Sequence, residues 1–80
     1  MQLQNVQAKI NEGKQEFQNN TYFLANYLKV NLSTRAVISD YITEKGELEG
    51  LRVLIDNNLE DGYATIGLGA GPTFSKIKFY

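Results

Sequence analysis

The chain has 80 residues, a net charge of −1, and no cysteine, histidine or tryptophan. This length fits one domain, the lack of cysteine excludes disulfides and thiolate zinc sites, and the lack of histidine excludes the usual catalytic triads. The near-neutral charge also removes the broad electrostatic case for nucleic-acid binding. We therefore expect a non-enzymatic protein with no catalytic residues, cofactor or metal.

The composition indicates a small globular protein. Its apolar share of 42% is ordinary for a folded domain, and no apolar run approaches the roughly 18 residues that would span a membrane. The N-terminus is polar and Gln-rich, unlike a signal peptide, so we expect a cytoplasmic protein, or one in the host cytoplasm if a phage encodes it. A chain of this size buries only about 60% of its unfolded surface, which favours a homo-oligomer on stability grounds.

Residues 2–18 are predicted to form an amphipathic helix. Gln, Lys and Glu favour helix and separate a stripe of apolar or small residues at helical spacing. The stripe consists of Leu3, Val6, Ile10, Gly13 and Phe17. It is shorter than the ~3–4 heptads of a coiled coil, which favours a helix lying across a sheet over a helix–helix dimer seam. Residues 19–21 are predicted to end this helix.

Residues 22–42 have two interpretations that periodicity does not separate. As strands, alternate residues from Tyr22 to Val30 share a face, a turn follows at 31–34, and alternation resumes as far as Ile42. As helices, apolar pairs recur at helical spacing on both sides of that turn, with Ser33 as the N-cap of the second helix. We leave both interpretations open.

The helical interpretation matters because residues 24–34 look like the middle of a helix-turn-helix motif. Ala25, Leu28 and Val30 match its small residue and the apolar pair around its tight turn. Lys29, however, stands where the turn usually has glycine. The motif is therefore weak.

After residue 42 the β interpretation is stronger. Residues 43–47 are predicted to be a hairpin turn, 48–55 a strand and 56–62 a loop. Asp56, Asn58 and Glu60 alternate as in a calcium loop, but Asp61 occupies the position that requires glycine and Gly67 the position that requires glutamate. A solvated turn is predicted there.

Residues 62–80 give the clearest signal, an antiparallel hairpin that turns at residues 69–72. Its apolar face consists of Ala64, Ile66, Leu68, Ile77 and Phe79. Its other face combines rings, lysines and bare glycine backbone, and the candidate partner-binding residues there are Tyr63, Phe74, Lys76, Lys78 and Tyr80. The glycine spacing fits neither a dinucleotide fingerprint nor a Walker loop.

We predict one α+β domain over residues 1–80, in which the helix packs on a four- or five-stranded antiparallel β meander formed by residues 22–80. The expected function is binding through protein–protein contacts, with a protein partner or a second copy, as a phage- or mobile-element-type accessory or inhibitor protein. The alternative is a winged helix-turn-helix transcriptional regulator with the hairpin as its wing. Arg35, Lys76 and Lys78 are then the candidates for nucleic-acid contact, which the net charge disfavours.

Overall fold

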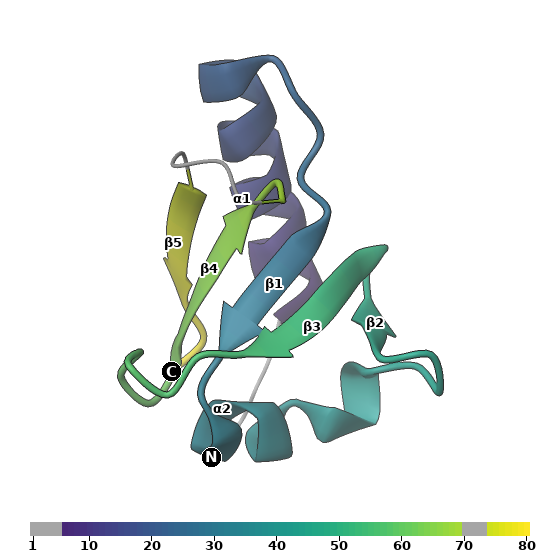
Figure 1. Cartoon of the computed structure of the whole chain (residues 1–80), viewed down its shortest axis with the longest axis vertical. Coiled ribbons are helices and arrows are strands. Elements are labelled where there is room, and N and C mark those ends of the chain that lie inside the picture. Colours follow the sequence, from purple (N-terminus) through teal and green to yellow (C-terminus); the bar gives the residue numbers. More distant parts are fainter. Residues whose placement is uncertain (1–5, 70–73) are drawn as a thin grey trace.

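The computed structural model of the chain describes residues 6–69 and 74–80, and Phe74 by its backbone alone. The fold is α+β: helix α1 (Val6–Thr21) lies across one face of a five-stranded sheet (Figure 1). The predicted class and the predicted helix on a sheet are confirmed. Leu3 and the tip of the predicted hairpin at residues 70–73 lie outside the described residues.

The strand order differs from that of the predicted meander. The strands are β1 (Tyr27–Val30), β2 (Glu47–Leu48), β3 (Leu51–Ile55), β4 (Tyr63–Gly67) and β5 (Phe74–Lys78). Their order in the sheet is β2-β3-β1-β4-β5, and β1 runs parallel to β3 while the other neighbours are antiparallel. A parallel pair needs a crossover connection. Helix α2 (Leu32–Val37) and the short η1 (Ser39–Tyr41) lie in that connection, below the sheet (Figure 1).

Residues 22–42 combine the two interpretations of this segment. Residues 27–30 form the central strand β1, and the residues that follow Asn31 form helix α2. Asn31, and not Ser33, is the N-cap, because its side-chain oxygen accepts a hydrogen bond of 2.7 Å from the Thr34 backbone N–H. A strand at the centre of the sheet replaces the first helix of the helix-turn-helix motif, so the winged-helix architecture is excluded.

Helix α1 buries the predicted stripe, of which Val6, Ile10, Gly13 and Phe17 are described. A methyl group at Gly13 would lie 2.7 Å from Ile66 Cδ1 and 2.9 Å from Ile77 Cγ2, closer than real Cβ atoms approach. The missing side chain therefore lets the helix approach the hairpin of β4 and β5. The stripe is a helix–sheet contact within the chain.

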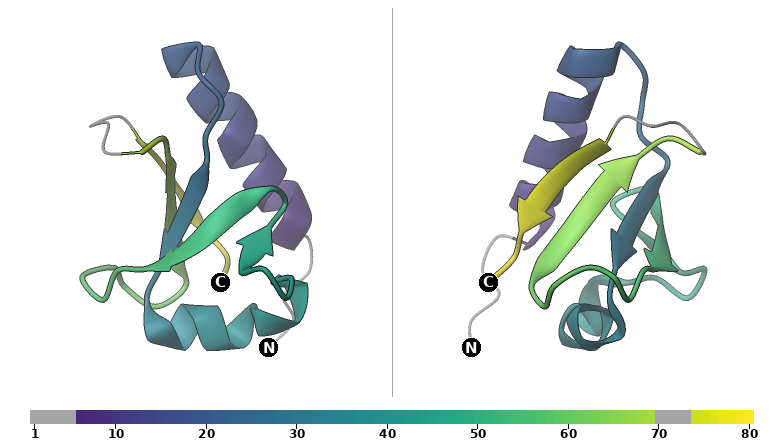
Figure 2. Two further views of the ribbon diagram at one scale, coloured as in Figure 1. Left: turned by 45° about the vertical axis from the view of Figure 1, so that its right-hand side comes forward. Right: turned by 60° about the vertical axis from the view of Figure 1, so that its left-hand side comes forward.

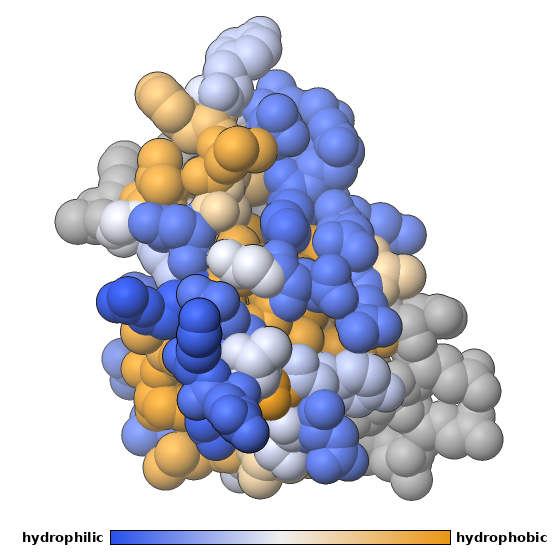
Figure 3. All heavy atoms as spheres, turned by 90° about the vertical axis from the view of Figure 1, so that its right-hand side faces the viewer, coloured by the Kyte–Doolittle hydropathy of each residue, from blue (hydrophilic) through white to orange (hydrophobic). Residues whose placement is uncertain are grey.

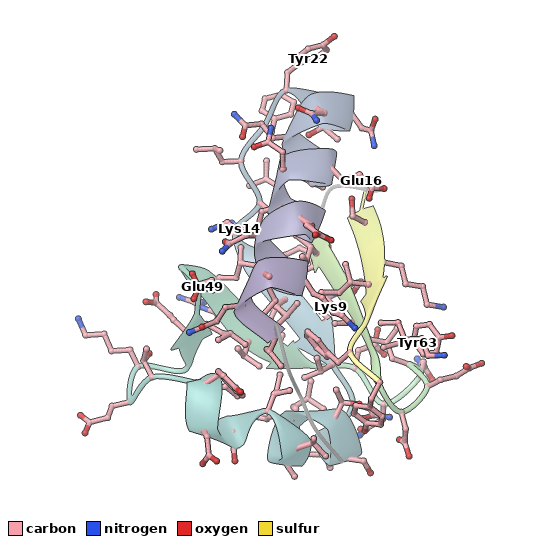
Figure 4. All side chains as sticks on the ribbon, turned by 180° about the vertical axis from the view of Figure 1, so that it is seen from behind. Lys9, Lys14, Glu16, Tyr22, Glu49 and Tyr63 are labelled. Atoms are coloured by element: carbon pink, nitrogen blue, oxygen red, sulfur yellow. The ribbon has the colours of Figure 1, made fainter. Side chains whose placement is uncertain are left out.

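Two lysines on α1 connect the helix to distant backbone (Figure 4). Lys9 Nζ donates to the carbonyl oxygens of Lys78, the last residue of β5, at 3.1 Å and of Phe79 at 3.3 Å. Lys14 Nζ donates to the carbonyl oxygen of Glu49 at 2.8 Å. Glu49 and Gly50 have φ angles of 51° and 80° and form a two-residue turn of type I′. This turn divides the predicted strand 48–55 into β2 and β3.

The core lies between the sheet, α1 and the α2–η1 segment. Its buried members are Val6, Ile10, Phe17, Leu28, Val30, Ile38, Leu48, Leu51, Ala64, Ile66 and Phe79. The apolar face predicted for the hairpin is therefore confirmed, with Leu68 and Ile77 partly buried against this cluster. No helix in the described part of the chain is long and apolar enough to cross a membrane.

Candidate functional site

The face of the sheet opposite α1 carries no helix in the described part of the chain (Figures 1 and 2). We call this surface the open face. Because residues that alternate along a strand point to opposite faces, the buried core residues of each strand identify the side chains of the open face. Those described are Tyr27, Lys29, Glu47, Arg52, Leu54, Tyr63, Thr65, Lys76 and Lys78, around the bare backbone of Gly67.

Three of these side chains form a compact group, the Tyr–Lys cluster. Lys78 is the cross-strand partner of Tyr63, and Lys76 partners the neighbouring Thr65. The Nζ atoms of Lys76 and Lys78 lie 4.6 and 5.6 Å from the centre of the Tyr63 ring. Each is a cation–π contact, of about 0.5–1 kcal/mol at an exposed site. The ring thus holds two ammonium groups side by side, with their charges turned to solvent.

A second tyrosine lies at the middle of the sheet. The Tyr27 ring crosses to the neighbouring strand and covers Gly67, its register partner, so closely that a Cβ atom on Gly67 would collide with the Tyr27 hydroxyl. Tyr27 is therefore only 7% exposed although it belongs to the open face. Lys29 Nζ lies 5.1 Å from the centre of this ring.

Positive charge is concentrated on the open face. Its strands carry Lys29, Arg52, Lys76 and Lys78 there, whereas the described acidic side chains at this face are Glu47, the cross-strand partner of Arg52 at the β2 edge, and Asp56 at its border. The chain as a whole has a net charge of −1. The rest of the surface is therefore acidic, and the charges of the domain are segregated.

Two shallow hollows lie along this face and share the Tyr27 side chain. One, of about 400 Å³, extends from Tyr27 towards Arg52 and Leu54 and is bordered by Glu47 and Gly50. The other, of about 270 Å³, extends from Tyr27 across Lys29 and Thr65 to Lys76, with Asp56 and Leu59 at its border. Both are open to solvent. They make a contact surface for an extended segment, and neither encloses a small molecule.

The predicted site residues are only partly brought together. Tyr63, Lys76 and Lys78 form the Tyr–Lys cluster. Tyr80 lies beyond β5, and its side chain packs against the core. Its ring covers Gly62, so that a Cβ atom added to Gly62 would lie 3.2 Å from the ring carbons. Phe74 pairs with Gly67 through its backbone, and its side chain lies outside the description. Arg35, the third candidate for nucleic-acid contact, lies on α2 below the sheet, away from the two lysines (Figure 1).

Sequence reasoning missed Tyr27, Lys29 and Arg52 as members of this surface. The sequence does show alternation in residues 27–30, where Tyr27 and Lys29 alternate with the apolar Leu28 and Val30. Their position beside the C-terminal hairpin depends on the antiparallel pairing of β1 with β4. No local signal in the sequence reports that pairing.

In residues 6–69 and 74–80, Asp and Glu side chains do not gather in groups of three that could hold a metal ion. In comparisons with known proteins, no family model matches the chain, and no curated protein or solved structure matches it significantly. Fold and surface together define a small α+β domain with one helix-covered face and one open, basic face.

The contact of Tyr27 with Gly67 gives a first prediction. We expect Gly67→Ala to destabilise the domain by about 1–3 kcal/mol, because the new methyl group displaces a nearly buried ring at the centre of the sheet. Urea unfolding followed by circular dichroism measures this loss. Gly67 does not have a positive φ, so backbone strain does not contribute to this loss. A change below about 0.5 kcal/mol would show that the Tyr27 ring moves aside without cost and would contradict the prediction.

Proposed function

We propose that the chain is a non-enzymatic protein-interaction module whose open face binds an acidic segment of a partner protein. The observation that carries the proposal is the Tyr–Lys cluster, in line with Lys29, on a face that no described helix covers. Gathering cations on one face opposes folding through like-charge repulsion, and an acidic partner relieves that repulsion. An accessory or inhibitory role, in which the module masks an acidic surface, follows from this proposal.

Nucleic acid is the weaker candidate for this surface. Single-stranded nucleic acids are bound largely by bases that stack on exposed aromatic rings. Here Tyr27 is almost buried, and the Tyr63 ring already carries two lysines. The net charge of −1 gives little general attraction to phosphate. An acidic protein segment offers carboxylates and has no bases to stack, so the lysine ammonium groups alone can bind it.

A second copy of the chain is also a poor occupant of the open face. Strand β5 is at the edge of the sheet, and it carries Lys76 and Lys78 on its open-face side. Pairing β5 with β5 of another copy would bring these lysines towards their equivalents, and like charges on adjacent strands are destabilising. Self-pairing along the β5 edge is therefore disfavoured, and the proposed partner is a different chain that offers carboxylates to the face itself.

Charge reversal tests the proposal. We expect Lys76→Glu/Lys78→Glu to weaken binding of a fluorescent oligoglutamate peptide at least about tenfold at low salt, because two attractive contacts become repulsive. Arg35→Glu/Lys45→Glu is the matched control: it makes the same change in net charge, on α2 and in the 43–47 turn. Fluorescence anisotropy measures both, with oligoglutamine and oligothymidylate as comparison probes.

The outcomes separate the candidates. Weakening confined to the Lys76/Lys78 variant, with oligothymidylate bound less tightly than oligoglutamate, supports the acidic-protein interpretation. Equal weakening by both variants would mean that net charge, and not this surface, governs binding. Tighter binding of oligothymidylate, lost in the same variant, would assign the surface to nucleic acid instead.

A further inference from the structure

The loop that follows α1 exposes three consecutive apolar side chains. Tyr22, Phe23 and Leu24 are 90, 62 and 70% exposed, more than the other large hydrophobic side chains described. They lie at one end of the molecule, where Tyr22 points away from the rest of the chain (Figure 4). Hydrophobic surface gathers at this end (Figure 3). We call these three residues the apolar tip.

The backbone of the apolar tip adopts a conformation that suits its sequence poorly. Tyr22 has φ of 64°, in the left-handed region, and its N–H donates to the Gln18 carbonyl oxygen at 2.8 Å to close the helix. Glycine or asparagine normally takes this position, because a bulky side chain is strained there. The isolated chain therefore bears the strain of Tyr22 and gains no burial from its ring. Contact with another molecule would supply that burial.

The charge around the apolar tip indicates what that molecule is. Residues 17–28 contain no Asp, Glu, Lys or Arg, in a chain of which 21% is charged. Lys14 lines the hollow beside Leu24, and its Nζ donates to the Glu49 carbonyl oxygen. Two copies that meet tip to tip bring equivalent residues together at the two-fold axis, so an uncharged tip lets them approach without repulsion. This is the reverse of the open face, whose lysines repel a second copy. A different protein or a ligand would have no such requirement for a neutral surface.

We propose that the apolar tip is the contact through which two copies of this chain associate about a two-fold axis. In such a pair each tip packs on its equivalent. Exposed aromatic and leucine side chains of this size offer roughly 400 Å² per copy, or about 800 Å² for the pair, before the neutral rim is added. That area is at the low end for a specific interface. The dimer is therefore weak and reversible, with a dissociation constant in the micromolar range or above.

The test uses Tyr22→Gly, which has opposite effects on the two states. Glycine relieves the backbone strain, so urea unfolding of the diluted monomer should shift to the same or higher urea concentration. The same variant removes the largest ring of the interface, so the dissociation constant from sedimentation equilibrium should rise at least about tenfold. A purely structural role for Tyr22 predicts loss of stability instead. Phe23→Gln/Leu24→Gln, tested in the same way, should also abolish the dimer.

Leu32→Gln is the control, because Leu32 is a similarly exposed apolar residue on α2, outside the tip. It should leave the dissociation constant within about twofold of the original. A wild-type mass that stays monomeric up to high concentration would overturn the proposal, as would unchanged association in both tip variants. Sedimentation of the monomer with lipid vesicles, lost in the tip variants, would also overturn it and make the tip a membrane contact. None of these results depends on oligoglutamate binding, so the two proposals fail separately.

Discussion

Replacing Gly13 by leucine is expected to destabilise the domain by about 3 kcal/mol or more, the range of severe overpacking in a core. Even a methyl group at this position meets Ile66 Cδ1 and Ile77 Cγ2 below 3 Å. Ile66 is fully buried, and Ile77 lies beside it on β5. Ile77 is only partly buried, but Ile66 cannot move aside without opening the core. A branched side chain must therefore push α1 away from β4.

Gly13→Ala separates the two influences at this position. Alanine favours a helix interior over glycine by about 1 kcal/mol, which stabilises α1. Its methyl group meets the two isoleucines, which destabilises the helix–sheet contact by about 1–3 kcal/mol if they cannot repack. We therefore expect a net loss smaller than that of leucine. Equilibrium unfolding in urea, followed by far-ultraviolet circular dichroism, gives the free energy of unfolding of each variant.

Asn11→Leu is the matched control, since it places the same side chain on the exposed side of the same helix. It should change the free energy of unfolding by no more than about 0.5 kcal/mol. Leucine tolerated equally well at positions 11 and 13 would contradict the close approach of α1 to the hairpin.

Helix α1 also shows why part of the fold was predictable from the sequence. The stripe of α1 has helical spacing, which the sequence shows. That the glycine within it marks a close approach is known only from its contacts with Ile66 and Ile77. The hairpin of β4 and β5 could also be predicted from the sequence, because apolar and polar residues alternate on both sides of a glycine-rich turn. Both signals are local: each lies within about twenty residues, over which one period dominates.

The remaining fold depends on pairings between distant residues. Parallel pairing of β1 with β3 joins Tyr27 to Arg52, and no property of either segment specifies that partner. Helix α2 is only six residues long, too short for a period to distinguish it from strand. The β2–β3 turn uses Glu49 at positive φ, where glycine or asparagine would have given a stronger signal.

The candidate site also has a part that local sequence patterns predict and a part that depends on pairing between distant strands. Tyr63, Lys76 and Lys78 share a face because their strands alternate, and the sequence predicted that. The continuation of the surface through Lys29 and Tyr27 depends on the register between β1 and β4. Tyr80 was assigned to this face by extending the alternation past Lys78. The strand ends there, and the Tyr80 ring covers Gly62 instead.

The loop that leads into Tyr63 is fixed by a small buried polar network centred on Asn31. The Asn31 side chain caps α2, and its amide nitrogen donates to the Leu59 carbonyl oxygen at 3.0 Å and to Asp61 Oδ1 at 2.7 Å. Thr34, which Asn31 caps, is fully buried and accepts a hydrogen bond of 2.8 Å from the Gly62 N–H. One side chain thus connects the end of β1, the start of α2 and the approach to β4.

Asn31→Leu should therefore cost about 2–4 kcal/mol of unfolding free energy, although leucine is similar in size. The loss combines about 1 kcal/mol for the helix cap with the cost of leaving the partners of the amide without a donor. Asn31→Ser should recover only the cap, because its short hydroxyl can still accept from the Thr34 N–H but does not reach the loop. Urea unfolding ranks the three proteins, and the predicted order of stability is Asn31, then serine, then leucine.

Asn57→Ala is the control for this network, because Asn57 lies in the same loop but makes one exposed hydrogen bond of 3.3 Å, to the Leu32 N–H. Its loss should stay near 0.5 kcal/mol. Serine as damaging as leucine would place the whole effect in the loop contacts and none in the cap. Because the loop carries Tyr63 into β4, a variant that frees the loop but leaves the sheet folded should also weaken oligoglutamate binding, whereas Asn57→Ala should not. The geometry of the Tyr–Lys cluster therefore depends on an amide just past the end of β1, beside the start of β4. The sequence of the hairpin alone does not show this dependence.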